Sequence, residues 1–434
     1  MEYSSRIKYS SFMIVFLSLF FFTGSCASIP YNAVNEGRYI PADFLGVVHA
    51  GMTNTVEEND LIDYMGITWL LETFNWNRIE PQQGNWDFQR YDTFVDNAIA
   101  NNVNVIGVLA YETPWIFEEG MARRKYIPPE KIPEFLNYVR TTVEHFKGRV
   151  GAWCVWNEPN WDFWTGTDAE FFELSRRAID AVREVDTEVI LLGGAVNRNI
   201  TGLRKKFIRG LFESGGLKNT DYIAFHPYDT NVKTSVRTYE NFRKIVDEYG
   251  FSERIWITEM GYPTGGWYPT RVTQKNLPKR VIQTIAYHAY AGAKKLLWYQ
   301  MYDPAERVLS DSEDFFGLVR SREDYTSKGA EAFRLCALYM QGAACYALTD
   351  GLPGSIQAFW YQGEEKSALV LWKEGLGSNQ VNILLPGTNH LLHNIVTGNA
   401  NSISKDIVVK IGSDPVFITY SNTSGSSDNK PVFK

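Results

Sequence analysis

The chain has 434 residues, of which 21% are charged, and its formal net charge is −7. This length and composition are typical of a soluble globular protein with one large domain and a smaller one. The acidic balance gives the chain no electrostatic reason to bind nucleic acid. Beyond Cys26 it has three cysteines at irregular spacing, and its six histidines lack zinc-type spacing. The sequence therefore implies no disulfide framework, no metal and no cofactor.

The N-terminus reads as an export signal. Arg6 and Lys8 precede an apolar stretch, Phe12–Phe22, and small residues follow it. The apolar stretch is too short to span a bilayer, so we expect residues 1–25 to form a signal peptide.

The processing of the chain at Cys26 decides between two routes of export. The residues before it resemble a bacterial lipobox, although Thr23 stands where a leucine is usual. If Cys26 becomes the first mature residue, a lipid on it would attach the protein to the cell envelope as a lipoprotein. Cleavage after Ala27 would instead release a secreted protein, and an uncleaved anchor is a third possibility.

From residue 40 to 346, apolar strand-like runs alternate with amphipathic helix-like segments, eight of each. Thr167 and Glu170 form a capping box before one of these helices. This pattern predicts an α/β fold, a (β/α)8 TIM barrel whose catalytic groups lie at the C-terminal ends of the strands. A doubly wound open sheet is the competing architecture, but no Gly-rich phosphate fingerprint follows an early strand. The predicted strands are Phe44–Val48, Ile67–Leu71, Val103–Ala110, Gly151–Trp156, Val189–Leu192, Tyr222–Phe225, Arg254–Thr258 and Lys295–Gln300.

Residues 347–420 change to short alternating runs separated by Gly, Asn, Asp and Pro turns. This pattern predicts a small C-terminal antiparallel domain, similar to a β-sandwich. The polar residues 421–434 are expected to form a disordered tail. The predicted strands of this domain are Ile356–Tyr361, Ala368–Trp372, Val381–Leu385, Ile407–Ile411 and Val416–Tyr420.

Two glutamates come just after predicted strands four and seven. Glu158 stands in Trp156-Asn157-Glu158-Pro159, and Glu259 stands in Trp256-Ile257-Thr258-Glu259. Two carboxyls that face one another at the mouth of a barrel can act as acid/base and nucleophile on an acetal. One of them must be ionised to attack and the other protonated to release the leaving group, and the charge on the first raises the pKa of the second.

With Phe225-His226-Pro227-Tyr228 between them, these motifs resemble the clan A retaining glycoside hydrolases, most closely family 39, with family 5 relatives as the alternative. The resemblance covers residues 40–310. It implies that Glu158 is the general acid/base and Glu259 the nucleophile, so we expect the charge on Glu259 to raise the pKa of Glu158 and to keep it protonated. It also implies that Asn157 binds the 2-hydroxyl of the sugar, and that Tyr228 orients the nucleophile with His226 beside it.

Further substrate-binding residues carry less specific signals. By the resemblance, Trp298 at the end of strand eight would form an aromatic floor for the sugar, with core packing as the alternative. Trp76 matches a family pattern after strand two, but Leu71 occupies the position where that pattern often has an arginine. His49 after strand one and Trp115 after strand three are candidates for subsites, with structural roles equally open.

The sequence thus predicts a retaining glycoside hydrolase that cleaves a β-linked oligo- or polysaccharide by double displacement. A carbohydrate-binding surface lipoprotein without turnover and a transglycosidase are the alternatives. The sugar, the linkage, exo or endo action and the oligomeric state are left open by the sequence.

Overall fold

The computed structural model describes residues 37–48, 56–118, 125–198, 203–267, 271–304, 307–320, 328–423 and 430–434. The expected signal peptide, Cys26 and His49 lie outside these residues. Within them, no helix combines the length and the apolar character needed to cross a membrane.

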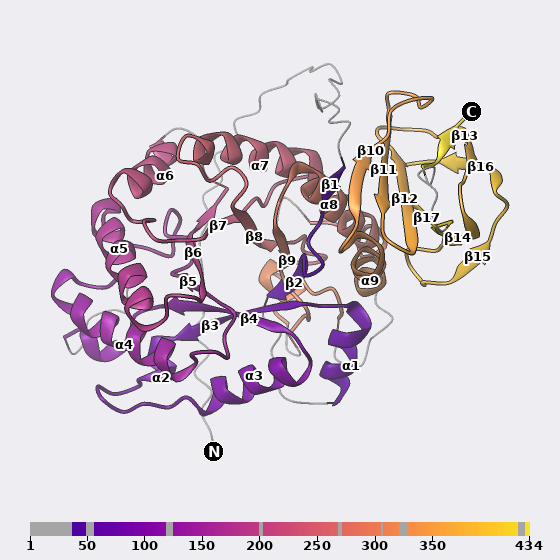
Figure 1. Cartoon of the computed structure of the whole chain (residues 1–434). Helices are drawn as coiled ribbons and strands as arrows, with labels where there is room; N and C mark the ends of the chain where they lie inside the picture. The colour runs from indigo at the N-terminus through magenta and orange to yellow at the C-terminus, as the bar shows by residue number, and fades with distance from the viewer. Residues whose placement is uncertain are drawn as a thin grey trace. The chain divides into compact units, whose positions relative to one another are not determined.

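Eight parallel strands close into a barrel (Figure 1). Each strand pairs with the next along the chain, and the last closes on the first through Leu45 opposite Leu296. The predicted (β/α)8 barrel is confirmed. Each of the eight predicted runs overlaps one of its strands, which are β2 Leu45–Val48, β3 Trp69–Asn75, β4 Asn104–Ala110, β5 Ala152–Val155, β6 Ile190–Asn197, β7 Tyr222–His226, β8 Ile255–Met260 and β9 Lys295–Trp298.

Helices follow the strands around the outside of the barrel (Figure 1). The predicted capping box begins α5, because the Thr167 side chain accepts from the backbone of Glu170 and the Glu170 side chain accepts in return. The helices are α1 Val56–Met65, α2 Trp76–Ile79, α3 Gln89–Ala100, α4 Ile132–His145, α5 Asp168–Val185, α6 Leu203–Glu213, α7 Val232–Asp247, α8 Leu277–Ala291 and α9 Lys328–Met340. Short 3-10 turns are η1 Pro114–Ile116, η2 Pro129–Lys131, η3 Gln274–Asn276 and η4 Ser312–Phe315.

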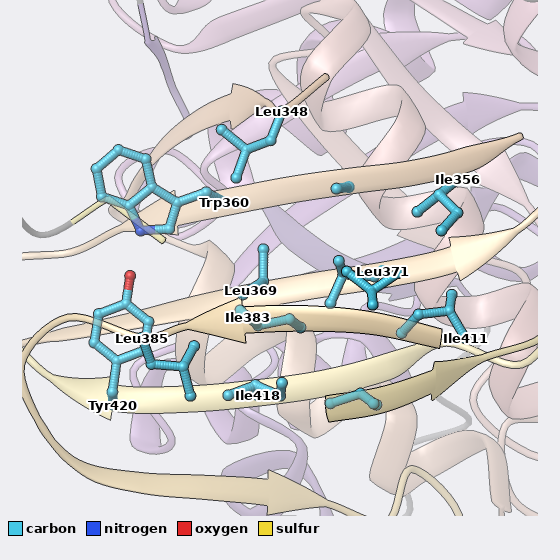
Figure 2. Packing of buried hydrophobic residues seen from close by; sticks show 13 residues of the cluster. Leu348, Ile356, Trp360, Leu369, Leu371, Ile383, Leu385, Ile411, Ile418 and Tyr420 are labelled. Carbon is cyan, nitrogen blue, oxygen red and sulfur yellow. The ribbon is translucent and has the colours of Figure 1, made fainter. Parts of the chain in front are cut away.

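Two antiparallel sheets form the C-terminal β domain. One sheet has the order β1-β10-β11-β12-β17-β14-β15, and the other has the order β16-β13-β18. Thirteen buried residues from both sheets, including Trp360, Ile383 and Ile418, pack together into a separate apolar core (Figure 2). The strands are β1 Arg38–Tyr39, β10 Ala344–Ala347, β11 Ile356–Gln362, β12 Lys366–Lys373, β13 Asn379–Leu384, β14 Thr388–His393, β15 Ala400–Ser402, β16 Asp406–Ile411, β17 Val416–Ser421 and β18 Val432–Phe433.

The limits of this domain differ from the sequence expectation at three places. β10 begins at Ala344, three residues before the predicted boundary. β1 comes from the start of the described chain and pairs with β10. The expectation of disorder after residue 420 does not hold for the last residues, because β18 pairs with β13 through Ile383 opposite Phe433. Both added strands depend on partners far away in the sequence.

The β domain packs on the outside of the barrel at α8. The Tyr287 ring of α8 meets the rings of Phe359 and Trp372 edge-on, with centroids 5.6 and 5.1 Å away. Glu374 Oε1 accepts hydrogen bonds from the Tyr287 hydroxyl at 2.9 Å and from Trp372 Nε1 at 3.0 Å. Lys233 of α7 lies 3.5 Å from the same carboxylate. The junction therefore combines aromatic packing with one shared carboxylate.

Candidate active site

Glu158 and Glu259 both lie at the C-terminal ends of barrel strands. Glu259 is in β8, and Glu158 is three residues beyond β5. The backbone after β5 is unusual, since φ is 67° at Trp156 and 42° at Glu158. Non-glycine residues rarely adopt positive φ values, and such residues concentrate at functional sites. The Glu158 N–H donates to the carbonyl of Ala195 in β6 at 2.8 Å, which fixes this turn.

The Glu158 carboxylate is buried and held by two side chains. His226 Nδ1 lies 2.7 Å from Glu158 Oε1, and Asn197 Nδ2 donates to the same oxygen at 2.9 Å. Asn197 is held in turn by Asn160, whose Oδ1 accepts from the Asn197 backbone at 2.8 Å. Sequence reasoning missed Asn197, because it ended this strand at Leu192 and so placed residue 197 in a loop.

His226 connects the two glutamates. Its Nδ1 lies 3.6 Å from Glu259 Oε2 as well as 2.7 Å from Glu158. Its Nε2 lies 3.0 Å from the hydroxyl of Thr258, which fixes the plane of the ring. Burial acts to lower the pKa of His226, but the charges on Glu259 and Glu158 outweigh it and raise the pKa. The buried imidazole therefore holds its proton more tightly than an exposed histidine does.

Glu259 has Tyr228 as its second partner. The Tyr228 hydroxyl donates to Glu259 Oε2 at 3.2 Å. Burial raises the pKa of Glu259 to about 7, and the charge on Glu158 acts in the same direction, against His226 and Tyr228. Glu259 therefore retains its proton to a higher pH than an exposed carboxyl does.

Asn157 and Tyr111 lie beside the two carboxyls. The Tyr111 hydroxyl is hydrogen-bonded to the Asn157 side chain, and both Glu259 and Glu158 act electrostatically on this phenol. The Tyr111 ring meets Trp156 edge-on, with centroids 5.2 Å apart. Asn157 is partly exposed. Its binding of a sugar hydroxyl stays a prediction.

Tyr299, rather than Trp298, is the aromatic side chain near Glu259 at the end of strand eight. Trp298 is fully buried and packs near Tyr262, so it presents no face to a sugar. The Tyr299 ring lies 6.5 Å from the Tyr228 ring, and its hydroxyl donates to Glu313 Oε2 at 3.0 Å. Successive residues of a strand point to opposite sides, so Trp298 faces the core and its neighbour Tyr299 faces the site.

The remaining predicted residues separate into buried and accessible ones. Trp76 is fully buried, stacks on Tyr138, and donates to Glu80 Oε2 at 2.7 Å, so it packs the base of its loop. Trp115 donates to the Glu80 carbonyl at 2.9 Å but is partly exposed. Leu71 is buried in β3, and the charged partner that the structure gives Glu259 is His226.

One group of side chains among the described residues has the composition and spacing of a metal site. Single ligand atoms of Glu158, His226 and Glu259 all lie within 4.8 Å of one another. Two carboxylates and one imidazole suit a divalent transition metal. The same short distances also suit a shared proton, because carboxylate and imidazolium attract each other.

Comparisons with known proteins show the family of the chain. The family model described as "Glycosyl hydrolases family 39" matches residues 24–252, which is more than half of the chain. The chain belongs to glycosyl hydrolase family 39. The matched residues include Glu158 and His226, whereas Glu259 lies seven residues beyond them.

Relatives of this family 39 chain include characterised proteins and solved structures. It is 26% identical over 205 residues to the endo-1,4-beta-xylanase B of Thermotoga neapolitana, over 44% of this chain and 57% of that protein. The fold resembles that of a family 39 glycoside hydrolase from Bacteroides cellulosilyticus WH2, with TM-score 0.70, 17% identity, and coverage of 88% and 81% of the two chains. A monomeric beta-xylosidase from Caulobacter crescentus CB15 gives TM-score 0.64 at 14% identity, over 90% and 99%.

Proposed function

We propose that this protein is a retaining glycoside hydrolase that cleaves a β-linked oligo- or polysaccharide by double displacement. The observation that carries the proposal is the separation of the two glutamates, since one ligand oxygen of each lies within 4.8 Å of the other. Retaining enzymes hold their carboxyls about 5 to 5.5 Å apart, whereas inverting enzymes leave room for a water molecule at about 6.5 to 9.5 Å.

The roles follow from the partners of each group. Glu259, ionised and hydrogen-bonded to Tyr228, attacks the anomeric carbon and forms a glycosyl ester. Glu158 gives its proton to the departing glycosidic oxygen, so the leaving group departs as an alcohol. Glu158 then takes a proton from water, whose oxygen attacks the anomeric carbon and returns Glu259 as a carboxylate.

His226 acts in both steps because it contacts both carboxyls. It lies 2.7 Å from one and 3.6 Å from the other. A cation in this position lowers the energy of whichever carboxyl is charged. When Glu259 becomes an ester, Glu158 is the carboxylate that His226 still contacts, and it carries the negative charge before water is activated.

A 1,4-β-linked xylan is the first substrate to test. The relatives that support it are the xylanase of Thermotoga neapolitana and the beta-xylosidase of Caulobacter crescentus, by the names those proteins carry. The match covers 57% of the length of the xylanase.

The test combines product analysis with one substitution. The protein is incubated with xylan and a panel of other β-glycans and aryl glycosides, and proton NMR follows the anomeric form of the first product. We expect retention, and we expect Glu259→Ala to reduce turnover by at least about 10³-fold. Glu365→Ala, which removes an exposed carboxylate of the β domain, is the matched control. An α-configured first product from a β-glycoside would refute the mechanism. If no substrate of the panel gives a product, a carbohydrate-binding protein without turnover is favoured.

We also propose that the protein is exported. The support is the sequence alone: basic residues, the apolar stretch Phe12–Phe22 and small residues before Cys26. A lipid on Cys26 would hold it at the cell envelope, and cleavage after Ala27 would release it. The intact mass of the mature protein distinguishes the two forms, and an unlipidated N-terminus at Ser28 would exclude the lipid anchor.

A further inference from the structure

Trp267 stands out among the tryptophans that the structure describes because it is exposed. Its relative exposure is 88%, whereas the others are buried or partly buried. Leaving an indole in water forgoes the stabilisation of about 1.5 to 3 kcal/mol that burial of a large apolar side chain gives. A single exposed apolar residue needs no explanation in itself. The position of Trp267 on the barrel is what gives it significance.

The loop that carries Trp267 follows β8, the strand of Glu259, and is fixed against η4. Thr264 N–H donates to the carbonyl of Phe315 at 2.9 Å. A Cβ on Gly266 would lie 2.4 Å from the backbone of Ser312, so the two segments touch with no room for a side chain there. Trp267 therefore leaves the loop directly beside the start of η4.

η4 links this position to the carboxyl pair. Its Glu313 accepts a hydrogen bond from Tyr299, whose ring lies beside Tyr228, the partner of Glu259. The segment before η4 adds a second exposed apolar side chain, Leu309, at 82% exposure. An aromatic face, an aliphatic side chain and the carboxylate-bearing η4 thus occupy the rim of the barrel next to the site.

We propose that Trp267, with Leu309 beside η4, forms an additional subsite that packs against a sugar unit further along the β-linked chain than the units at Glu158 and Glu259. The C–H face of a pyranose packs on an indole as other apolar surfaces do. Acidic side chains of η4 can accept hydrogen bonds from sugar hydroxyls and repel anionic glycans. The subsite therefore selects long, neutral chains. This inference rests on the proposed hydrolase function.

The test compares substrates of different length. Wild type, Trp267→Ala and Trp267→Phe are assayed on 4-nitrophenyl β-xyloside and on xylo-oligosaccharides of two to six units. We expect Trp267→Ala to lower kcat/KM for the hexasaccharide by about 3- to 10-fold, while the aryl xyloside is unaffected and Trp267→Phe retains most of the activity. Leu376→Ala, which removes an equally exposed apolar side chain from the β domain, should change neither substrate.

Equal losses on long and short substrates, or no loss on either, would overturn the subsite. If the wild type hydrolyses none of these probes, the proposed xylan hydrolysis is refuted, and the subsite is tested by binding alone. The binding assay measures iodide quenching of tryptophan fluorescence with and without xylohexaose. Protection that is present in wild type and absent in Trp267→Phe would support the subsite, and no protection in wild type would refute it.

Discussion

Replacing Glu259 with Gln should stabilise the protein, and the gain should depend on pH. Burial raises the pKa of this carboxyl from 4.5 to about 7, so the folded protein binds the proton more tightly than the unfolded chain does. The stability that this proton confers is complete below pH 4.5 and is lost as the pH rises to about 7. Each unit of pKa is worth about 1.4 kcal/mol, so at pH 8 the ionised carboxylate costs about 3 kcal/mol.

The Gln side chain has the shape of the protonated acid but does not ionise, so it avoids the destabilisation by a buried carboxylate at pH 8. Thermal unfolding of wild type and Glu259→Gln at pH 5 and pH 8 measures the effect. For a chain of this length, about 3 kcal/mol corresponds to roughly 3 to 4 °C in Tm, expected at pH 8, with most of the gain absent at pH 5. Glu365→Gln controls for loss of a surface charge. A stabilisation equal at both pH values, or destabilisation at pH 8, would refute the assignment of the raised pKa to Glu259.

Three further predictions follow from the same contacts. Because Glu259 must be ionised to attack, kcat/KM should rise about tenfold per pH unit up to about pH 7; a rate independent of pH between 5 and 7 contradicts this. Zn²⁺ should inhibit the enzyme reversibly by binding to Glu158, His226 and Glu259, and a chelator should restore activity. The inhibition should be stronger at pH 8 than at pH 6, because protons compete with the metal for these ligands. Glu374→Ala should cost about 2 kcal/mol in chemical denaturation by removing acceptors for Tyr287 and Trp372, and an unchanged denaturation midpoint would argue against that junction.

The barrel could be predicted from the sequence because each buried parallel strand is a local apolar run. Its periodicity places Glu158 and Glu259 at the same end of the fold without knowledge of any long-range contact. His226 and Tyr228 were likewise identified by a motif on one strand end. The structure adds the distances that bring these four side chains together.

The parts that sequence reasoning missed depend on orientation or on distant partners. The choice between Trp298 and Tyr299 turns on which side of a strand end faces the site, and an apolar run with both sides buried does not reveal it. Glu313 comes from a 3-10 turn after strand eight that no periodicity marks. No residue of β14 or β15 is fully buried, so the alternation that identifies strands is weak there.

The pairing of β1 with β10 means that the C-terminal domain is not one continuous stretch of sequence. Gly37 lies against the ring of Tyr346, where a Cβ would come within 2.2 Å of it, and Arg38 pairs with Cys345. A chimera that exchanges only the residues after 343 would leave this strand facing a foreign partner. Engineers who wish to transplant the β domain, or to express the barrel by itself, should move or remove residues 37–39 together with it.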